Sequence, residues 1–339
     1  MTTAPATTTP VGFGVVGLEH LHVFELVDGL CAAGAVPIAH TSGDSLSDAY
    51  GAWQTESMAT DAAGVLADDR VQLVVLAGVP STRADAAVAA LDAGRSVLSD
   101  KPGATTSDQL ERVRAAVAQS AGRWWVLFSE RFGVPAVRVA TTLARDGAIG
   151  EVVHVSGSAP HRGALDQRPE WFFDPGRAGA LLVDLGAHQV DQFLASTGAE
   201  TADVVGAASG NVAAPDHPAF HDIAEVSLAA GDVRGHHRVD YLEADGFPAW
   251  GDVRLVITGT AGRLEVRTPV VDGVAGAPEL WCTDHDGHRR VDVDPTVTWP
   301  RELLDDLADG GERLMSREHP FAVTTVCLSA AAGATPWTS

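Results

Sequence analysis

The stretch VGFGVVGLEHLH, residues 11–22, decides the fold of the first part of the chain. An apolar run ends near Gly17, and a short polar segment then leads into an amphipathic stretch that reaches Ala33, which is the order of a strand, a turn and a helix. Gly12, Gly14 and Gly17 match the pattern G-x-G-x-x-G, but the first two lie inside the apolar run. Because the glycines of a dinucleotide-binding fingerprint follow the strand, we expect the phosphate turn to begin at Gly17.

Apolar runs continue to alternate with helix-like segments through the first 130 residues. This alternation predicts right-handed crossovers and a parallel, doubly wound sheet, whose ligands bind at the carboxyl ends of the strands. Later runs, such as 222–230 and 253–258, follow one another as antiparallel strands do, and the stretch 319–332 predicts a final helix. We therefore predict an α/β chain with a Rossmann domain at 1–130, residues 1–10 being a disordered lead-in, and an α+β domain with a large, mostly antiparallel open sheet at 131–339.

The composition narrows the class of protein. A formal net charge of −22 disfavours nucleic acid and anionic membranes as partners. Three distant cysteines suggest neither a disulfide framework nor a zinc site, and no metal is expected. No run approaches the ~20 apolar residues of a membrane span, and the N-terminus lacks the pattern of a signal peptide. We expect a soluble, cytoplasmic protein.

The expected phosphate turn departs from the usual glycine pattern. Counting from Gly17, the second and third glycine positions hold Glu19 and His22. A carboxylate at the second position would repel a pyrophosphate, although His20 or His22 could supply compensating donors. The acid that would bind the adenine ribose is also missing, since Thr41 and Ser42 follow the second strand, and the choice between NAD and NADP stays open.

Four segments in order resemble the Gfo/Idh/MocA family, whose members are oxidoreductases acting mostly on sugars and cyclitols. The family's E-K-P segment is resembled by AALDAGRSVLSDKPGATT, in which Asp100 replaces Glu. The family's stretch that crosses into the second domain is resembled by ERFGVPAVRVATTLARDGAIGEVVHV. DPGRAGALLVDLGAHQVDQFL is similar to its G-x-x-x-D-x-G-x-H-x-x-D helix, and ITGTAGRLEV to its G-T-x-G turn. The resemblance runs from about Val11 to Gly333. It implies an NAD(P)-dependent dehydrogenase for a polyol or sugar that forms a homodimer or homotetramer through the C-terminal sheet.

The resemblance also implies site residues. It puts Lys101 and Pro102 beside the nicotinamide and makes Asp184 and His188, with Lys101, the catalytic set. Arg83 stands where members often carry histidine, which is a third departure besides the glycine turn and the ribose acid. The predicted cofactor-binding residues are Gly17, Glu19, His20, Leu21, His22, Thr41, Ser42, Gly78, Pro80, Arg83, Asp100, Lys101 and Pro102. The predicted substrate-binding residues are Lys101, Arg131, His161, Arg162, Trp171, Asp184 and His188.

The chemistry of alcohol oxidation agrees with these residue types. Hydride removal needs a base that titrates near neutral pH, which suits histidine. Asp184 and His188 are four residues apart in a predicted helix, so they share a face on which the carboxylate could orient the imidazole. Lys101 is the only lysine in the chain, and its ammonium at the substrate oxygen would stabilise an alkoxide. Pro102 biases it toward an extended backbone as the chain leaves the strand.

Two alternatives remain open from the sequence. A hydrolase or lyase that holds NAD tightly and reduces it only transiently would use the same lysine, aspartate and histidine. A non-catalytic ligand-binding member that has lost the dinucleotide would explain Glu19 and the missing ribose acid. Retention of cofactor through purification would distinguish the first alternative, and absence of dinucleotide binding the second.

Overall fold

The structure, a computed structural model, describes residues 10–337. Residues 1–9, which hold nearly all of the predicted lead-in, and 338–339 lie outside the described residues. The described chain divides into two compact units. Unit one contains residues 10–100, 112–125 and 299–316, and unit two contains 101–111, 126–298 and 317–337.

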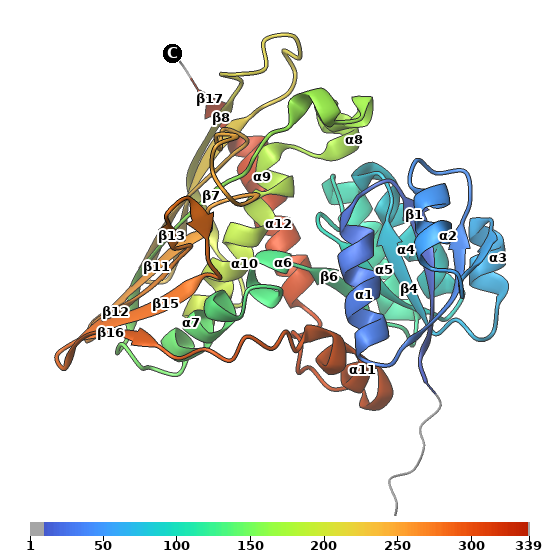
Figure 1. Ribbon diagram of the computed structural model, residues 1–339, viewed down its shortest axis with the longest axis horizontal. Coiled ribbons are helices and arrows are strands. Elements are labelled where there is room, and N and C mark those ends of the chain that lie inside the picture. The colour runs from blue at the N-terminus through green and yellow to red at the C-terminus, as the bar shows by residue number, and fades with distance from the viewer. Residues whose placement is uncertain (1–9, 338–339) are drawn as a thin grey trace, which may run out of the picture. The chain divides into compact units, whose positions relative to one another are not determined.

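A six-stranded sheet forms the centre of the first unit (Figure 1). Its strands are β1 (Gly12–Leu18), β2 (Val36–Thr41), β3 (Met58–Thr60), β4 (Leu73–Ala77), β5 (Ser96–Asp100) and β6 (Trp124–Leu127). They lie in the order β3-β2-β1-β4-β5-β6, and β1 pairs in parallel with both β2 and β4. This is the strand order of a doubly wound dinucleotide-binding sheet, so the predicted fold class is confirmed.

Helices connect these strands as the sequence pattern predicts. They are α1 (His22–Ala32), α2 (Ser47–Trp53), α3 (Ala62–Ala67), α4 (Pro80–Asp92) and α5 (Ser107–Gln119). The short β3 and α3 were not predicted, because three strand residues and six helix residues carry too little periodicity to be recognised.

The glycines of β1 explain why the literal glycine motif is a decoy. A Cβ on Gly12 would lie 2.1 Å from the carbonyl oxygen of Arg70, and one on Gly14 would lie 2.4 Å from the Val65 side chain. Both glycines therefore serve close packing inside the strand. Gly17 differs from them, since it has a φ of +79°, and a Cβ there would lie 2.5 Å from the Cα of Gly78. The turn thus begins where the sequence predicts it.

A nine-stranded sheet forms the second unit. Its strands are β7 (Val152–Pro160), β8 (Asp203–Gly210), β9 (Ile223–Ala230), β10 (Val233–Asp240), β11 (Arg254–Gly259), β12 (Gly262–Arg267), β15 (Glu279–Asp284), β16 (Gly287–Val291) and β17 (Thr335–Pro336). Their order is β16-β15-β12-β11-β7-β10-β9-β8-β17, and neighbours are antiparallel except for the β10–β7 and β17–β8 pairs. A separate hairpin joins β13 (Val270–Val271) to β14 (Val274–Ala275).

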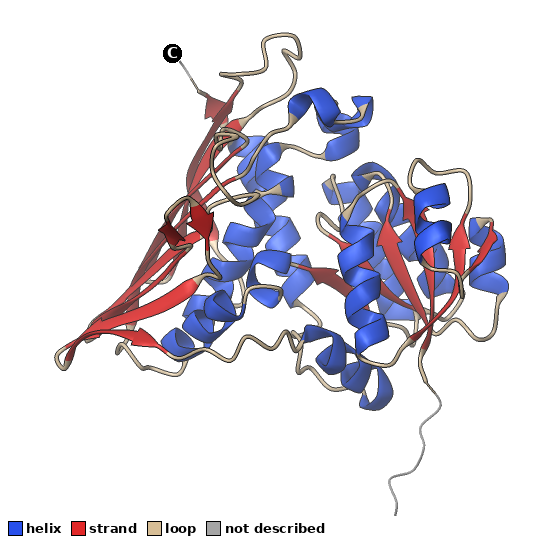
Figure 2. Cartoon of the chain, viewed as in Figure 1, coloured by secondary structure: helices blue, strands red, loops and turns tan. Residues whose placement is uncertain are grey.

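The main helices of this unit gather on one face of the large sheet (Figure 2). The helices of the unit are α6 (Ser129–Phe132), α7 (Pro135–Arg145), α8 (Pro175–Ala178), α9 (Leu181–Asp184), α10 (Gly186–Thr197) and α12 (His319–Gly333), with 3-10 turns η1 (Leu165–Gln167) and η2 (Glu170–Phe173). α10 packs against α7, α12, β7 and β10 and is buried nearly all round. Its polar side chains must therefore find partners inside the protein.

The predicted domain boundary near residue 130 does not coincide with the division into units. The helix α11 (Trp299–Asp309) belongs to unit one, where its Trp299 ring packs against Gly29 of α1. Arg301 donates a 3.1 Å hydrogen bond to the carbonyl oxygen of Ala33 at the end of α1. The sequence pattern shows an amphipathic segment here but does not say on which sheet its apolar face packs.

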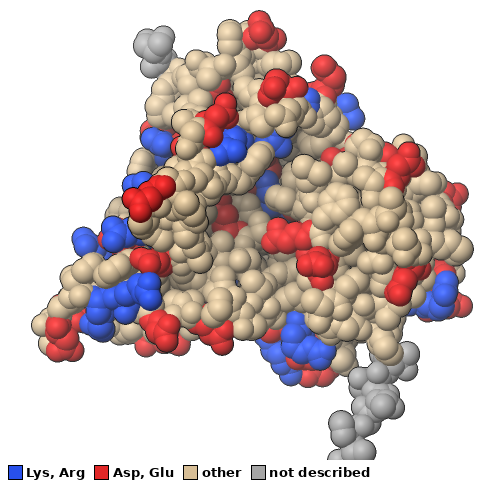
Figure 3. Space-filling model, viewed as in Figure 1, with Lys and Arg blue, Asp and Glu red and all other residues tan. Residues whose placement is uncertain are grey.

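The described surface carries mixed charge. On the face drawn in Figure 3, basic side chains lie in small groups beside acidic ones. Among the residues described, no helix has the length and apolarity needed to cross a bilayer.

Candidate active site

The predicted site residues fall into both units. Those of the dinucleotide turn, up to Asp100, belong to unit one, and those of the expected chemistry, from Lys101 onward, belong to unit two. Asp100 ends β5, and Lys101 is joined to it by a peptide bond.

Backbone hydrogen bonds to neighbouring strands fix the turn after β1. The amides of Glu19 and His20 donate to the carbonyl oxygen of Ala77 at distances of 3.1 and 2.9 Å. The amide of Gly17 donates to Oγ1 of Thr41, 3.0 Å away at the end of β2. The turn is therefore held to both strands that flank β1.

The carboxylate of Glu19 is held by the loop after β2. Its Oε2 accepts a 2.5 Å hydrogen bond from the Ser45 hydroxyl, and its Oε1 accepts a 3.3 Å bond from the Ser45 amide. These bonds explain how a carboxylate is accommodated at the second glycine position. They also fix a negative charge on the turn that precedes α1.

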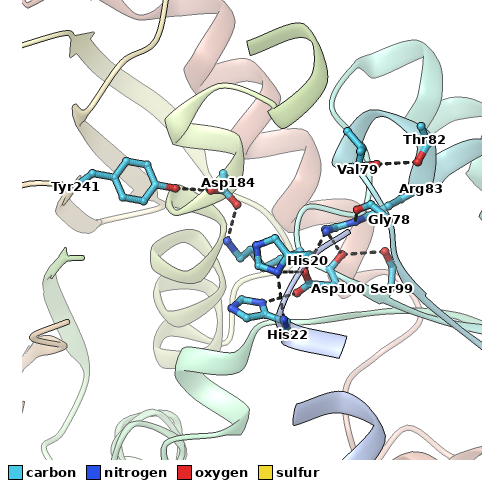
Figure 4. A network of polar contacts seen from close by, with 11 residues as sticks. His20, His22, Gly78, Val79, Thr82, Arg83, Ser99, Asp100, Asp184 and Tyr241 are labelled. Atoms are coloured by element: carbon cyan, nitrogen blue, oxygen red, sulfur yellow. Dashed lines mark hydrogen bonds and ion pairs between the residues drawn. The ribbon is translucent and has the colours of Figure 1, made fainter. Parts of the chain in front are cut away.

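The two histidines of the turn face Asp100 (Figure 4). Nδ1 of His22 lies 2.9 Å from Oδ1 of Asp100, and Nδ1 of His20 lies 3.3 Å from Oδ2. Arg83 approaches the same carboxylate, with a guanidinium nitrogen 3.1 Å from Oδ2. Burial alone would raise the pKa of Asp100, but His22, Arg83 and His20 together hold it well below its usual value. Asp100 is therefore a buried anion at the end of β5.

Arg83 also ties this carboxylate to the strand before it. Its Nε donates to the carbonyl oxygen of Gly78 at 2.8 Å, and another nitrogen donates to the carbonyl oxygen of Asp100 at 3.1 Å. The side chain is 1% exposed. Arg83, predicted as a cofactor residue, thus joins the ends of β4 and β5.

The ligand atoms of His20, His22 and Asp100 lie within 4.8 Å of one another, close enough for a metal ion. Arg83 already supplies a cation to the same carboxylate. The guanidinium of Arg83 thus balances the negative charge of Asp100 without a metal ion.

The end of β2 holds no free acid for a ribose. Thr41 donates through Oγ1 to Oδ2 of Asp44 at 2.6 Å, and Asp44 also accepts from the amide of Leu18 at 3.0 Å. Ser42 donates its hydroxyl to the carbonyl oxygen of Thr60. The nearby carboxylate of Asp44 is therefore used within the protein.

The turn nevertheless fits a dinucleotide. The close approach of Gly17 and Gly78 keeps side chains away from the backbone at the ends of β1 and β4. Leu21, at the N-cap of α1, offers no side-chain oxygen to the first turn of that helix, and Pro80 opens α4. The partial positive charge at the N-terminus of this eleven-residue helix favours an anionic oxygen. Pyrophosphate oxygens are ligands of this kind.

In unit two, Lys101 and Asp184 form a short ion pair. The Nζ–Oδ1 distance is 2.5 Å, and Lys101 is 3% exposed. The Lys101–Pro102 peptide bond is cis. The structure thus brings together Lys101 and Asp184, two of the three predicted catalytic residues.

Tyr241 completes this group, and the sequence analysis missed it. Its hydroxyl donates a 2.7 Å hydrogen bond to Oδ2 of Asp184, as Figure 4 shows. Burial raises the pKa of Tyr241 well above its usual value, and the adjacent Asp184 charge raises it further. The phenol therefore keeps its proton and acts as a donor. As one of only two tyrosines in the chain, it offered a weak signal in the sequence.

The helix predicted to carry Asp184 and His188 is in fact two helices. Asp184 ends α9, and His188 lies in the first turn of α10 after a break at Leu185. Leu185 between them keeps helical dihedrals (φ −73°, ψ −35°), so the predicted helical stretch is present with an interruption at this residue, and Gly186 begins the second helix. His188 is 2% exposed, and its amide donates to the carbonyl oxygen of Leu185.

Arg131, predicted to bind substrate, is engaged inside the unit. Its guanidinium donates two hydrogen bonds to Asp191, of 2.7 and 2.6 Å, and Nε2 of His319 lies 2.6 Å from the same carboxylate. Burial would raise the pKa of Asp191, but Arg131 and His319 lower it. Arg131 therefore links α6 to α10.

Arg162 and Trp171 are likewise occupied in the fold. Arg162 donates to the carbonyl oxygens of Phe247 and Ala249. Trp171 lies in η2 and is 8% exposed, with its ring beside that of Phe172. These contacts within the protein neither require nor support the contacts with substrate that were predicted for Arg162 and Trp171.

A cavity of about 200 Å³ lies within unit two beside Asp184. Phe172, Phe220 and Tyr241 contribute aromatic rings to its lining, with centroids 5.3 to 5.8 Å apart. Phe172, the neighbour of Trp171, is therefore the aromatic residue of that loop that reaches the site. The run WFF signalled an aromatic loop but not which ring faces the cavity.

Two family models match the chain. The model described as an oxidoreductase family with an NAD-binding Rossmann fold matches residues 10–128. The model of the GFO/IDH/MocA C-terminal domain matches residues 137–265. The two matches correspond to the two sheets described above.

Solved structures share the whole fold. A protein of Erwinia carotovora atroseptica SCRI1043, described as a candidate oxidoreductase, is 31% identical with a TM-score of 0.90, over 97% of this chain and 100% of that one. A levoglucosan dehydrogenase, solved with NADH and levoglucosan, is 18% identical with a TM-score of 0.82, over 96% of this chain and 98% of that one. At that identity the second likeness shows the fold alone.

Curated relatives match over shorter segments. The uncharacterized oxidoreductase YdgJ of Escherichia coli K12 is 28% identical over 171 residues, which are 50% of this chain and 49% of that protein. Levoglucosan dehydrogenase of Pseudarthrobacter phenanthrenivorans is 26% identical over 157 residues, 45% of this chain and 40% of that protein. The matches thus span about half the length of these relatives or less. From the two family models and the Erwinia structure together, the chain belongs to the Gfo/Idh/MocA family of NAD-binding oxidoreductases.

Proposed function

We propose that the chain is an NAD(P)-dependent dehydrogenase or reductase that interconverts a secondary alcohol and a ketone on a sugar, sugar derivative or cyclitol. The observation that carries this proposal is the buried group of Lys101, Asp184 and Tyr241, in which a carboxylate holds an ammonium at 2.5 Å and a phenol at 2.7 Å. A family that binds NAD supplies the redox partner.

The residues of unit two divide the work of the reaction. The bound nicotinamide would accept or donate the hydride. Lys101 presents a positive charge to the substrate oxygen and so stabilises the alkoxide that forms as the hydroxyl proton is removed and from which hydride then leaves. Asp184 holds the ammonium in place, and Tyr241 fixes the orientation of that carboxylate. His188 is the proposed base that takes the hydroxyl proton, because imidazole titrates near neutral pH.

In unit one, the turn after β1 would hold the dinucleotide. The N-terminus of α1 would face the pyrophosphate, with Gly17 and Gly78 allowing the backbone to approach. Thr41 and Ser42 would lie toward the adenine ribose. Since neither is acidic, this end accepts NAD or NADP.

A sugar-like substrate has two supports. The levoglucosan dehydrogenase that shares the fold was solved with levoglucosan, a sugar derivative. The cavity beside Asp184 presents three aromatic rings, and such faces pack well against the C–H faces of a sugar ring. The sheet face away from the main helices would form the interface of a homodimer or homotetramer, which light scattering would detect.

The test is a screen of sugars, sugar acids and cyclitols with NAD+ and NADP+, followed at the nicotinamide absorbance. We expect turnover of at least one polyol, and the variant Lys101→Met should lower kcat on it by about 10²-fold or more. Arg70→Met, which removes an exposed cation beside Asp68 in unit one, serves as the matched control and should keep kcat. Equal loss in both variants, or full activity of Lys101→Met, would contradict the proposal. Dinucleotide that stays bound through purification and turns over without net reduction would favour the hydrolase or lyase alternative.

A further inference from the structure

An arginine lies beside the aromatic rings of the cavity in unit two. The guanidinium carbon of Arg168 is 4.5 Å from the centroid of the Phe172 ring and 5.9 Å from that of the Tyr241 ring. Both rings line the cavity beside Asp184. The Tyr241 hydroxyl donates to Asp184, whose other oxygen holds the ammonium of Lys101. Tyr241 thus connects Arg168 to the group that contains the proposed catalytic lysine.

Contacts with the backbone and with a third ring fix the position of Arg168. Its Nε donates a 3.0 Å hydrogen bond to the carbonyl oxygen of Gly163, and the centroid of the Trp250 ring lies 5.3 Å from the guanidinium carbon. The amide of Arg162 donates to the carbonyl oxygen of Trp250 at 2.9 Å, and the Arg162 side chain donates to two further carbonyl oxygens of the same segment. The Arg168 guanidinium is therefore held by one carbonyl oxygen and three aromatic rings.

These contacts leave hydrogen-bond donors of Arg168 unused. A guanidinium has five N–H groups, and the carbonyl oxygen of Gly163 accepts one of them. Within residues 10–337, the terminal nitrogens Nη1 and Nη2 make no hydrogen bond, and no carboxylate forms an ion pair with this half-buried side chain. A planar guanidinium with free N–H groups matches a carboxylate or a phosphate, each of which accepts two parallel hydrogen bonds.

The charges of this region also favour an anionic ligand at Arg168. The positive charge of Lys101 is balanced by Asp184, whereas that of Arg168 has no such carboxylate among the residues described. The chain as a whole carries a formal net charge of −22, which repels anions. An anionic substrate therefore needs a cation held at the site, and Arg168 supplies one.

We propose that Arg168 binds an anionic substituent of the substrate, a carboxylate or a phosphate, and so directs the enzyme toward sugar acids or sugar phosphates rather than neutral sugars. This inference rests on the proposed function, because it names the substrate class of the same site. Trp250 is 51% exposed, and its ring offers an apolar face to the sugar beside the guanidinium.

The first test compares ligands in the wild-type protein. Calorimetric titrations use matched sets of gluco, galacto and manno configuration, each with the hexose, the hexuronate and the hexose phosphorylated at its primary hydroxyl. In at least one set an anionic member should bind about tenfold or more tightly than the neutral hexose. The member that does so shows whether the anion is a carboxylate or a phosphate. Neutral hexoses that bind as tightly as both anions in every set, or no binding of any anion, would overturn the proposal.

The second test removes the cation. In Arg168→Met the Kd of the preferred anion should rise by about tenfold or more, while that of its neutral hexose changes by less than about threefold. Arg168→Lys keeps the charge but not the planar fork and should recover only part of the affinity. Arg145→Met is the matched control, since it removes an exposed arginine of unit two that pairs with Asp146 at 3.6 Å, and it should keep the wild-type Kd.

Equal weakening of anionic and neutral ligands in Arg168→Met would mean that Arg168 only braces the three rings, and it would contradict the proposal. The comparison of ligands in the wild-type protein needs no variant, so it decides the question even where Arg168→Met does not fold.

Steady-state kinetics separate this inference from the proposed function. In Arg168→Met the KM for the anionic substrate should rise by about tenfold or more, and kcat should fall by less than about threefold, because the contact is made equally in the ground and transition states. Turnover of neutral sugars with no preference for anionic ones would refute the role of Arg168 and leave the dehydrogenase proposal intact. Binding of an anion that depends on Arg168, without turnover of any compound, would support the role of Arg168 and contradict the proposed function.

Discussion

Lys101 is the one lysine among 23 lysine and arginine residues. Its ammonium is nearly buried and lies against one carboxylate oxygen of Asp184. An ammonium is a compact point charge, whereas a guanidinium is a planar fork that would engage both carboxylate oxygens. Here the second oxygen, Oδ2, is reserved for Tyr241. The geometry therefore gives a physical reason for a lysine at a position where arginine would compete with the phenol.

At this scale the sequence predicted part of the site. Motif spacing brought out Lys101, Asp184 and His188, because these residues lie within short recognisable segments. Tyr241 could not be found in this way, since it reaches Asp184 across 57 positions of sequence. The same holds for Glu130, a buried residue of α6 whose carboxyl group accepts a hydrogen bond from Gln189 across 59 positions. Such long-range hydrogen bonds depend on how the helices and the sheet pack, which no local pattern encodes.

Replacement of Tyr241 by phenylalanine tests the hydrogen bond to Asp184. The variant leaves Oδ2 without its 2.7 Å donor, so the carboxylate should turn and hold Lys101 less well. We expect kcat/KM to fall by about tenfold or more, in line with ~1.5–3 kcal/mol for a hydrogen bond to a charged group. Steady-state kinetics check this.

Tyr50→Phe is the matched control for that experiment, since it changes the other tyrosine of the chain, which is buried in α2. Its kcat should stay at the wild-type value. If Tyr241→Phe kept full kcat/KM, the role given to Tyr241 would have to be withdrawn.

At the scale of elements, the sequence predicted most strands and where the turn begins. The apolar run with Gly12 and Gly14 becomes β1, and Gly17 takes the positive φ that the turn requires. The break between α9 and α10 was not predicted. Leu185 keeps helical dihedrals (φ −73°, ψ −35°) at the break, and a single glycine after it, Gly186, does not by itself predict that a helical pattern is interrupted.

The carboxylate on the turn after β1 can be tested by Glu19→Gln. The amide can keep an interaction with Ser45 but removes a negative charge before the N-terminus of α1. Binding of NADH should therefore tighten by about two- to fivefold, corresponding to ~0.3–1 kcal/mol for a charge near a helix end. Nicotinamide fluorescence measures the Kd.

Glu25→Gln controls for the change of net charge, because Glu25 is an exposed residue in the first turn of α1. Its Kd should move less than that of Glu19→Gln. A Kd for Glu19→Gln equal to or weaker than wild type would show that the carboxylate does not oppose the dinucleotide.

The contact between α6 and α10 should make stability depend on pH through Glu130. Burial raises the pKa of Glu130 from 4.5 to about 7, so the native state holds a proton that the unfolded state has lost. Stability is thus retained below about pH 4.5 and falls as the pH rises through 7, by on the order of 3 kcal/mol. Glu130→Gln should lose this dependence.

Urea denaturation of both proteins from pH 5 to 8.5 measures the difference between their free energies of unfolding. Taking the difference cancels the titrations that the two proteins share, such as those of Asp100 and Asp191. A constant difference across this range would mean that Glu130 has an ordinary pKa.

At the scale of the whole molecule, the sequence pattern predicts the two sheets, one in each half of the chain. It does not predict which other segments belong to each unit. Residues 101–111 join unit two, and residues 299–316 return to unit one. The return depends on Trp299, which packs on Gly29 where a side chain would leave no room. The sequence can identify α11 as an amphipathic helix. The surface that it packs on, however, includes Gly29 of α1 and forms only when α1 lies against its sheet, so the sequence pattern does not reveal it.

The account as a whole depends on dinucleotide binding by a turn that carries Glu19 and His22 in place of glycines. The most direct measurement is a titration of the purified protein, stripped of cofactor, with NADH and then NADPH, followed by nicotinamide fluorescence. We predict binding of at least one of them with a Kd in the micromolar range. No binding of either by protein shown to be folded by circular dichroism would contradict the dehydrogenase account and favour a ligand-binding member of the family.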